Sequence, residues 1–333
     1  MGKGSRRMVS WWWLAVLLLA AFALGMWLQG WRMSRQAVPS EAVRFVAGPQ
    51  TVRAQGMRSV CELLPPQQNH VQQCSANRPM FTMSHPKSGR TWMRCLVSYA
   101  YACLHNTTDQ LSLKDLGAYS GNVLDCWHGE PHHPYVRSAW DLAHAFARER
   151  PHERDNGVLI VRDPRDVIVS SYYQRLYREE HKWILPWTTL SDFLRFETGS
   201  LKTLLMFMNL WSAVAENPTW TVLRYEDIKA CPSRALHHIV NERLCLGVSP
   251  QCIQKAVSKC SFDRLQREAD KSGNDNDIWQ PSDPNNPNSR KVRKGKVGGY
   301  RDDLSAEDID FVEAMIEEHL VGGRIFEYER PAK

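Results

Sequence analysis

The chain has 333 residues, of which 23% are charged and 43% hydrophobic, and its formal net charge is +6. This length allows one large domain or two small ones with a sizeable buried core. The composition is that of a globular protein and excludes a disordered tail, a collagen or a nucleic-acid-coating protein. We therefore expect no nucleic-acid partner.

The first predicted element is a hydrophobic segment at residues 8–28, which contains no charged residue. As a helix it spans roughly 31 Å, about the thickness of a bilayer core. Tryptophans at both ends, at positions 11–13, 27 and 31, are typical of aromatic belts. The alternative is a cleaved signal peptide, but the apolar stretch is long for one and continues past the possible cleavage site at residues 21–23. We expect a short tail at residues 1–7 and a transmembrane helix at residues 8–28 that attaches the protein to the membrane.

Several features favour a type II orientation with a lumenal domain, as in a Golgi protein. Basic residues are denser on the short N-terminal side of the span, which favours a cytoplasmic tail. All nine cysteines follow the span, and this number is compatible with a few disulfides in an oxidising lumen. Asn106 begins an Asn-Thr-Thr glycosylation sequon.

The cysteines leave their pairing open, because an odd number leaves at least one unpaired. Their spacing relative to histidine fits no zinc pattern, so we expect no metal. The candidate disulfides are one between Cys61 and Cys74 and others among Cys231, Cys245, Cys252 and Cys260.

Residues 29–78 lack helical or strand periodicity and are predicted to form a stem. Residues 79–330 alternate between strands and helices. The expected strands are 80–84, 123–127, 158–161 and 220–223, and the expected helices are 91–104, 164–178, 201–216, 232–246, 250–269 and 306–320. This alternation predicts an α/β fold with a mostly parallel central sheet and helices on both faces. The third strand is fully apolar and is expected to be central, whereas the polar segment 271–290 is either disordered or a functional lid.

Residues 85–92 (HPKSGRTW) connect the first expected strand to its helix. The N–H groups at a helix start and the flexible Gly89 allow such a loop to surround an anion, and Lys87 adds a cation. Ser88 and Thr91 add hydroxyl donors. The loop lacks the G-x-x-x-x-G-K-[ST] pattern, which argues against a nucleotide triphosphatase or kinase. Taken alone, it is equally compatible with an ordinary strand–helix connection.

Further segments accompany this loop in a fixed order: 162–173 (RDPRDVIVSSYY), 222–229 (VLRYEDIK), 260–263 (CSFD) and 293–300 (RKGKVGGY). Together with residues 86–92 they resemble the motifs of the sulfotransferases that use 3′-phosphoadenosine 5′-phosphosulfate (PAPS). The resemblance covers about residues 79–330. It implies a P-loop-like phosphosulfate-binding loop at residues 86–92, a 3′-phosphate site after the third strand and a C-terminal RKG segment.

The resemblance implies the following donor site. The backbone of residues 87–92 holds the 5′-phosphosulfate, and Trp92 and Tyr225 contact the adenine. Arginines and a serine hold the 3′-phosphate, because a guanidinium binds phosphate bidentately. The implied donor-binding residues are Lys87, Ser88, Gly89, Arg90, Thr91, Trp92, Arg162, Ser170, Tyr225, Arg293, Lys294 and Gly295.

Three of these positions keep an alternative. Arg162 could form a surface ion pair with Asp163 or Asp166, and Trp92 could have a plain core role. Arg90 stands where the family usually has threonine, and it either faces solvent or adds charge beside the donor.

The implied reaction moves a sulfuryl group in line between two oxygens, so that catalysis is mostly positioning and charge stabilisation. Lys87 stabilises the leaving oxygen, and the resemblance implies that Ser170 steers Lys87. The acceptor hydroxyl needs a base, for which His128 is our first choice. Glu130, His132 and His133 are the alternatives, as is a solvated loop without catalytic role. Trp127 replaces the threonine that precedes the histidine in the family.

We therefore expect a PAPS-dependent sulfotransferase that acts on a hydroxyl of a glycan or glycoconjugate. The acceptor wall is expected from loops that include residues 181–190 and 271–290. A small alcohol, phenol or lipid is the alternative acceptor, and a non-catalytic nucleotide-binding membrane protein is the alternative function. A homodimer is compatible with these expectations.

Overall fold

A computed structural model describes residues 80–108, 111–113, 115–116, 124–127, 157–178, 184–197, 199–271, 279–321, 326 and 328. All of them belong to the unit formed by residues 50–333, and only that unit is considered below. The predicted tail, transmembrane helix and stem lie outside the described residues. Within the described ranges, every helix is too short or too polar to cross a membrane.

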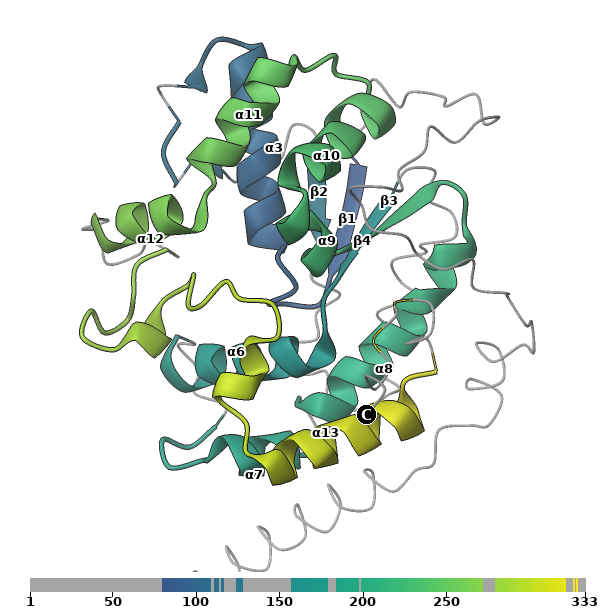
Figure 1. Cartoon of the computed structure of the whole chain (residues 1–333), viewed down its shortest axis with the longest axis vertical. Coiled ribbons are helices and arrows are strands. Elements are labelled where there is room, and N and C mark those ends of the chain that lie inside the picture. Colours follow the sequence, from purple (N-terminus) through teal and green to yellow (C-terminus); the bar gives the residue numbers. More distant parts are fainter. Residues whose placement is uncertain are drawn as a thin grey trace, which may run out of the picture. The chain divides into compact units, whose positions relative to one another are not determined.

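The described strands form one parallel sheet in the order β2-β1-β3-β4 (Figure 1). They are β1 (Met80–Ser84), β2 (Leu124–Trp127), β3 (Gly157–Val161) and β4 (Trp220–Arg224). Each begins and ends within one residue of the strand predicted from the sequence. β3 has a strand on either side, which confirms that the apolar run 158–161 is central. All residues of β1 and β3 are buried, so both faces of the sheet must be covered.

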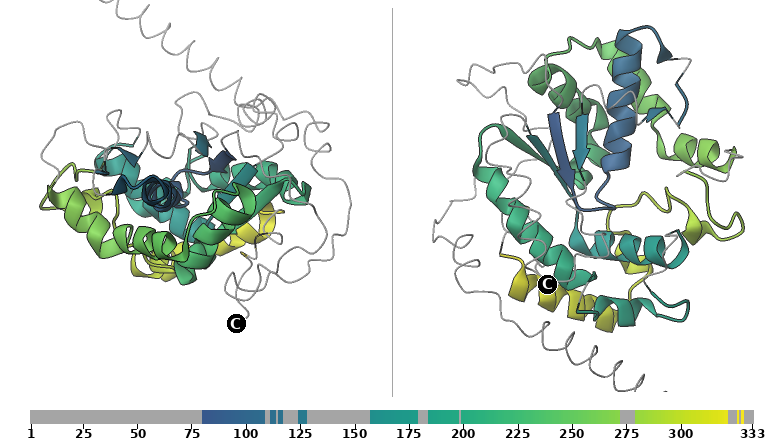
Figure 2. Two further views of the ribbon diagram at one scale, coloured as in Figure 1. Left: turned by 90° about the horizontal axis from the view of Figure 1, so that it is seen from above. Right: turned by 180° about the vertical axis from the view of Figure 1, so that it is seen from behind.

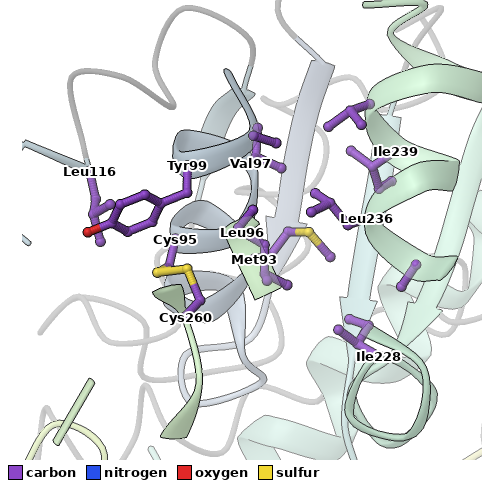
Figure 3. Packing of buried hydrophobic residues seen from close by; sticks show 14 of the residues in the cluster. Met93, Cys95, Leu96, Val97, Tyr99, Leu116, Ile228, Leu236, Ile239 and Cys260 are labelled. Atoms are coloured by element: carbon purple, nitrogen blue, oxygen red, sulfur yellow. A yellow bond between two sulfur atoms is a disulfide. The ribbon is translucent and has the colours of Figure 1, made fainter. Parts of the chain in front are cut away.

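One face of the sheet packs against α3 (Arg90–Leu104), α10 (Pro232–His237) and α11 (Pro250–Lys259). Side chains alternate along a strand, so Met80, Val158 and Ile160 point into this first core. Figure 3 shows Met93, Leu96 and Val97 of α3 facing Leu236 and Ile239.

The opposite face packs against α6 (Pro164–Tyr177), α8 (Leu201–Ser212) and α13 (Ala306–His319). Phe81, Leu159 and Val161 belong to this second core, in which α7 (Leu190–Leu194) also packs. Figure 2 shows the helices on the two sides of the sheet. The predicted α/β architecture with helices on both faces is therefore confirmed.

Several helices differ from their predicted extents. The expected helix 250–269 is two helices, α11 and α12 (Phe262–Lys271), because the chain leaves the helical path at Cys260, whose carbonyl accepts a hydrogen bond from the Trp92 indole. The expected helix 232–246 becomes a π-helical turn, η4, over His238–Arg243. The expected helix 201–216 ends as the 3-10 turn η3 (Ala213–Glu216). The sequence did not predict α7, α9 (Tyr225–Ala230), η5 (Pro287–Ser289) or η6 (Gly299–Asp302).

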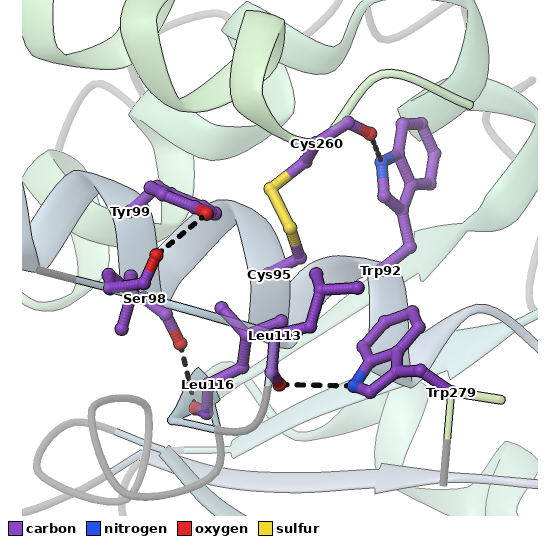
Figure 4. The surroundings of a disulfide bond; sticks show 9 residues. Trp92, Cys95, Ser98, Tyr99, Leu113, Leu116, Cys260 and Trp279 are labelled. Carbon is purple, nitrogen blue, oxygen red and sulfur yellow. Dashed lines mark hydrogen bonds between the residues drawn. A yellow bond between two sulfur atoms is a disulfide. The ribbon is translucent and has the colours of Figure 1, made fainter. Parts of the chain in front are cut away.

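The disulfides connect different cysteines from those predicted. Cys95 is bonded to Cys260 (Figure 4). Cys103 is bonded to Cys252, so both bonds join α3 to the α11 segment. The prediction that Cys252 and Cys260 pair within the C-terminal group was wrong, because α3 packs along α11 and brings its own cysteines within reach. Cys231 and Cys245 are also disulfide-bonded. Cys61 and Cys74 lie outside the described residues.

The polar segment 271–290 is ordered where the structure describes it. Trp279 is only 2% exposed, and its indole donates to the Leu113 carbonyl at 3.0 Å. Ser289 is fully buried, and its hydroxyl donates to the Asp283 carbonyl. Residues 279–290 therefore form a packed covering rather than a disordered loop.

Candidate functional site

A cavity of about 250 Å³ lies at the carboxyl end of the sheet. It is lined by the loop after β1, by residues that follow β3 and β4, and by a C-terminal segment at residues 291–299. Ligands of parallel α/β sheets bind at this edge, because the loops after the strands meet there.

The loop between β1 and α3 has a backbone suited to an anion. Lys87 and Gly89 are both in the left-handed region, with φ of 73° and 101°. A Cβ atom on Gly89 would lie 2.6 Å from the Tyr225 ring, so glycine is required there by conformation and by space. α3 begins at Arg90, so the N–H groups of its first turn lie beside the cavity.

Lys87 is half-buried in the cavity wall. Its Nζ donates to Oε1 of Gln174 at 3.2 Å, one helical turn beyond Ser170. Burial lowers the pKa of Lys87 well below its usual value, and the nearby charges of Lys291, Arg178, Arg162 and Arg293 lower it further. A bound anion would offset this cost and hold the lysine in its charged form.

Arg162 connects three segments of the cavity wall. Its guanidinium donates to the carbonyls of Lys87 and Lys296, both at 3.2 Å. It also pairs with Asp166 at 3.3 Å and lies 4.4 Å from the centre of the Tyr225 ring. The predicted alternative, an ion pair with Asp166, is therefore present, but it holds Arg162 in the cavity wall and not at an open surface.

Asp166 fixes the C-terminal segment to the start of α6. Its carboxylate accepts hydrogen bonds from the backbone N–H groups of Gly298 and Tyr300, both at 2.9 Å. These contacts place residues 293–296 opposite the loop after β1, although about 200 residues separate the two in the sequence.

Arg293 and Lys294 share a carboxylate partner. Asp303 lies 3.2 Å from the Arg293 guanidinium and 2.9 Å from Lys294 Nζ. Burial of Asp303 opposes its charge, but hydrogen bonds from Lys294 and Arg293 outweigh this effect, so the pKa of Asp303 is lowered. Arg293 also lies over the Tyr173 ring at 4.3 Å, and both contacts hold its guanidinium in place.

An aromatic wall forms the other side of the cavity. Trp92 and Tyr225 meet edge to face with ring centroids 5.7 Å apart, and the Trp92 indole donates to the Cys260 carbonyl at 2.9 Å (Figure 4). Phe262 packs against Gly295, where a Cβ atom would lie 2.4 Å from the ring. Lys229 lies 5.7 Å from the ring centroids of both Trp92 and Phe262. Trp92 therefore packs against the core and also lines the cavity.

Glu226, in the segment after β4, connects this segment to the start of α6 and to Tyr328. Its carboxylate accepts from the Asp163 backbone N–H at 2.9 Å and from the Tyr328 hydroxyl at 2.7 Å. Burial raises the pKa of Glu226. This residue supports the start of α6 from behind the cavity.

The structure brings together the residues that the sequence predicted for the donor site. All of them line the cavity except Ser88, which is buried at 2% exposure. The solvent-facing alternative for Arg90 was wrong, since its side chain is buried and lines the cavity. His128, Glu130, His132 and His133 lie outside the described residues.

Thirteen of the lining residues were missing from the predicted site, among them Gln174, Lys229, Phe262, Trp279 and Lys291. Gln174 could have been found from its position four residues after Ser170, on the same helix face. Phe262 lies in the stretch 260–263, which already belonged to the resemblance. No local signal marks Trp279 or Lys291, which occur in and beside the polar segment.

The cavity has the chemistry of a site for a polyanion with a planar group. Eight cationic side chains line it, against one carboxylate, that of Asp166, among the described lining residues. Within the same described ranges, no group of three or more His, Cys, Asp or Glu residues is placed to hold a metal. The fold and the cavity thus define an α/β protein with a cationic site, suited to a nucleotide-like polyanion, at the carboxyl edge of its sheet.

The comparison with protein families identifies the family within this class. The sulfotransferase domain family matches residues 77–324. The chain belongs to the sulfotransferase family, and its general chemistry is sulfuryl transfer.

Three solved structures are similar to the chain. Retinol dehydratase in complex with androsterone and the inactive cofactor PAP is 18% identical, with 73% of this chain and 80% of that chain covered and a TM-score of 0.47. Retinol dehydratase with retinol and PAP is 18% identical, with 73% and 81% covered and a TM-score of 0.48. Mouse sulfotransferase SULT7A1 with PAP is 16% identical, with 76% and 89% covered and a TM-score of 0.48.

Proposed function

We propose that this protein transfers a sulfuryl group from PAPS to a hydroxyl of a glycan or glycoconjugate. The observation that carries the proposal is the convergence of Lys87, Arg162 and Arg293 on one cavity from three distant segments. PAPS carries a 3′-phosphate, a 5′-phosphosulfate and an adenine, and the cavity offers a matching surface for each.

The loop after β1 would hold the 5′-phosphosulfate. Its left-handed residues and the first turn of α3 supply backbone N–H groups, and Lys87, Arg90 and Thr91 line the same wall. Such N–H groups at a helix start favour negative charge.

The opposite wall would hold the 3′-phosphate. Arg162 and Arg293 are already oriented by Asp166 and Asp303, and Ser170 lies beside them in the lining. The aromatic wall of Trp92, Tyr225 and Phe262 provides the surface for the adenine.

Transfer would proceed by in-line displacement. The acceptor oxygen forms a bond to sulfur as the bond from sulfur to the 5′-phosphate oxygen breaks, and adenosine 3′,5′-bisphosphate (PAP) leaves. Lys87 stabilises the negative charge that develops on the leaving oxygen. The acceptor proton goes to a base, for which we propose His128, with Glu130 as the alternative.

The glycan acceptor rests on the predicted type II anchor at residues 8–28 and a lumenal, Golgi-type location. Two observations support an oxidising compartment. Six of the described cysteines are disulfide-bonded, including the pairs Cys95–Cys260 and Cys103–Cys252. Asn106 of the glycosylation sequon is exposed, as an acceptor asparagine must be.

The donor site is tested by retention of the full-length protein on immobilised PAP. We expect wild type and Lys202→Ala to be retained, since Lys202 is exposed and paired with Glu197. Arg162→Ala should be lost from the column, and Lys87→Ala should be retained more weakly than wild type. Retention that neither substitution weakens would refute the proposed donor site.

The reaction is tested by transfer of labelled sulfate from PAPS to a panel of glycans, steroids and phenols. Labelling of a glycan supports the proposed acceptor class, and labelling of steroids or phenols alone replaces it with the small-molecule alternative. PAP binding without transfer to any acceptor would indicate a non-catalytic nucleotide-binding protein.

A further inference from the structure

Cys231 and Cys245 flank one continuous helical segment, formed by α10 and η4. Both cysteines are disulfide-bonded and half-buried. Cys231 directly precedes α10, and its carbonyl accepts a hydrogen bond from the Ala235 N–H at 3.0 Å. Cys245 follows η4, where the Leu246 N–H donates to the Val240 carbonyl at 2.8 Å. The two cysteines therefore lie at opposite ends of the α10–η4 segment.

This separation prevents a bond between the two cysteines. α10 contains six residues, and at 1.5 Å per residue it alone covers about 9 Å along its axis, to which η4 adds its own length. The Cα atoms of bonded cysteines lie no more than about 7 Å apart. Cys231 and Cys245 therefore each have another cysteine as partner.

The number of cysteines limits these partners to three. The chain has nine cysteines, and the bonds from α3 to the α11 segment use four of them. Besides Cys231 and Cys245, this leaves Cys61, Cys74 and Cys126. A bond between Cys61 and Cys74, which the sequence suggested, would leave Cys126 as the one partner for two bonded cysteines. At least one bond must therefore involve a stem cysteine.

Cys126 lies at the wrong edge of the sheet to be the partner of Cys245. The imidazole of the first residue of η4 is 3.5 Å from the Thr221 hydroxyl, and the guanidinium of its last residue donates to the Thr219 carbonyl. η4 and Cys245 thus lie beside β4, at one edge of the sheet. Cys126 belongs to β2, at the opposite edge. Three strand spacings, about 14 Å in all, separate β2 from β4, which is about twice the Cα separation that a disulfide allows.

The stem joins the sheet at the end where Cys245 lies. The second residue of β1 and the first residue of β4 are both in register with Gly157 of β3. β1 therefore starts level with β4 and two strand spacings, about 10 Å, from it. Cys74 precedes β1 by six residues and Cys61 by 19. These stretches span up to about 20 Å and about 65 Å when extended, so either cysteine can reach Cys245.

We propose that the stem is cross-linked to the catalytic unit by a disulfide between Cys245 and either Cys61 or Cys74. The two thiols lose two protons and two electrons as the S–S bond forms, and a protein or glutathione disulfide is the oxidant that is reduced to two thiols. Cys231 then pairs with the other stem cysteine or with Cys126.

The bond has two consequences for how the protein is attached. It fastens the stem at the amino end of the sheet, whereas the cavity lies at the carboxyl end, so the attachment leaves the cavity free. A cut in the chain between the bonded stem cysteine and β1 would also leave the catalytic unit joined to its stem until the disulfide is reduced. Neither consequence depends on the proposed function.

Peptide mapping of the full-length protein tests the bond. The protein is alkylated without reduction, freed of N-glycans and digested with trypsin and Glu-C. Cleavage after Glu62 separates the two stem cysteines into fragments 59–62 and 63–87, whereas Cys245 lies in fragment 244–255. Mass spectrometry with and without reductant then identifies the fragments that are joined.

We expect one of the two stem fragments to be joined to fragment 244–255 and to be released by reductant. In Cys245→Ser, fragment 244–255 should carry no stem fragment. Cys126→Ser is the matched control, because it removes a cysteine outside the proposed bond, and it should leave the joined fragments unchanged.

Three results would overturn the inference: a bond between Cys61 and Cys74, a bond from Cys245 to Cys126 or Cys231, and Cys245 recovered in its alkylated form. The map of the wild-type protein decides among these results even if a variant does not fold. Because the map needs neither donor nor acceptor, its failure is distinct from a failure of PAP binding, which would refute the proposed function.

Discussion

The two ends of the cavity hold similar cations in different ways. At the 3′-phosphate end, Arg162 pairs with Asp166, and Arg293 and Lys294 pair with Asp303. At the reaction end, Lys87 has the neutral Gln174 as its partner, and Lys291 has none among the described residues. Arg162, Arg293 and Lys294 thus have carboxylate partners, whereas Lys87 and Lys291 have none among the described residues.

The cations at the two ends are therefore expected to have different roles: one group positions the donor, and the other stabilises negative charge. A cation held by a carboxylate is oriented before the ligand arrives and gains less from it, because part of its charge is already compensated. A cation whose charged form burial disfavours gains more when negative charge appears next to it. The 3′-phosphate end should therefore set where the donor lies, and the reaction end should set how fast sulfate moves.

The largest effect is expected at Lys87. Lys87→Ala should lower kcat by about 10²–10³-fold, because the leaving oxygen loses its stabilising charge. Lys87→Arg keeps a cation and should recover part of the rate. Steady-state transfer of labelled sulfate measures both constants. If Lys87→Ala changes the KM for PAPS and leaves kcat intact, the roles assigned to the two ends of the cavity are wrong.

Arg162→Ala should show the opposite pattern. We expect PAP affinity to fall by about 30-fold or more, since a charged contact and two backbone contacts are lost together. The kcat at saturating PAPS should change far less than in Lys87→Ala. Titration calorimetry with PAP gives the affinity, and an equal loss of kcat in both variants would show that the two ends are not functionally separate.

Removal of a disulfide changes no charge, so it can be compared with the charge substitutions at Lys87 and Arg162. Cys95→Ser with Cys260→Ser, and Cys103→Ser with Cys252→Ser, should each lower the free energy of unfolding by about 2–4 kcal/mol. Only the first pair adjoins the Trp92 contact on the Cys260 carbonyl, so only its loss should weaken PAP binding. Denaturant titration and calorimetry check the two parts. Equal weakening of PAP binding by both double substitutions would mean that global stability, not the aromatic wall, determines affinity.

The smallest effect concerns stability and pH. The pKa of Lys291 falls from 10.5 in the unfolded chain to about 8 in the folded protein, so the unfolded state binds more protons between these values. The loss of folding free energy caused by burying the charged Lys291 is therefore present below about pH 8 and disappears as the pH rises toward 10.5. After allowance for solvent screening, Lys291→Met should stabilise the ligand-free protein by about 1–2 kcal/mol at pH 7.

Denaturant titrations at pH 7 and pH 10 test this sign. The gain from Lys291→Met should shrink at the higher pH. A gain that is the same at both pH values would show that burial of the charge is not its cause. Destabilisation at pH 7 would show that Lys291 has a protein partner.

The sequence predicted the features that depend on local signals. The apolar run 158–161 and the loop 85–92 led to the strands and to the parallel sheet, and the resemblance to the sulfotransferase motifs led to 11 of the 24 residues that line the cavity. The hydrogen bond from Trp92 to the Cys260 carbonyl, which lies at the break between α11 and α12, could not be predicted because it joins segments far apart in the sequence. The disulfide partners depend on the same packing of α3 against α11.

Lys291 was missed for a related reason. Its lowered pKa comes first from burial and then from charges on α3 and at the C-terminal end of α6, which no sequence window contains together. Both alternatives for Arg162 hold in the structure, since Arg162 pairs with Asp166 and also lines the cavity. Sequence reasoning treated them as exclusive because it could not see that Asp166 faces the C-terminal segment.

The central claim is that one cavity grips the two phosphate ends of PAPS from three distant segments. A crystal structure of the protein with PAP tests it most directly. We predict the 3′-phosphate on Arg162 and Arg293, the 5′-phosphate on the backbone of residues 87–92, and the adenine between Trp92 and Phe262. Nucleotide bound outside this cavity, or bound in it without contact to Arg162 and Arg293, would contradict the account.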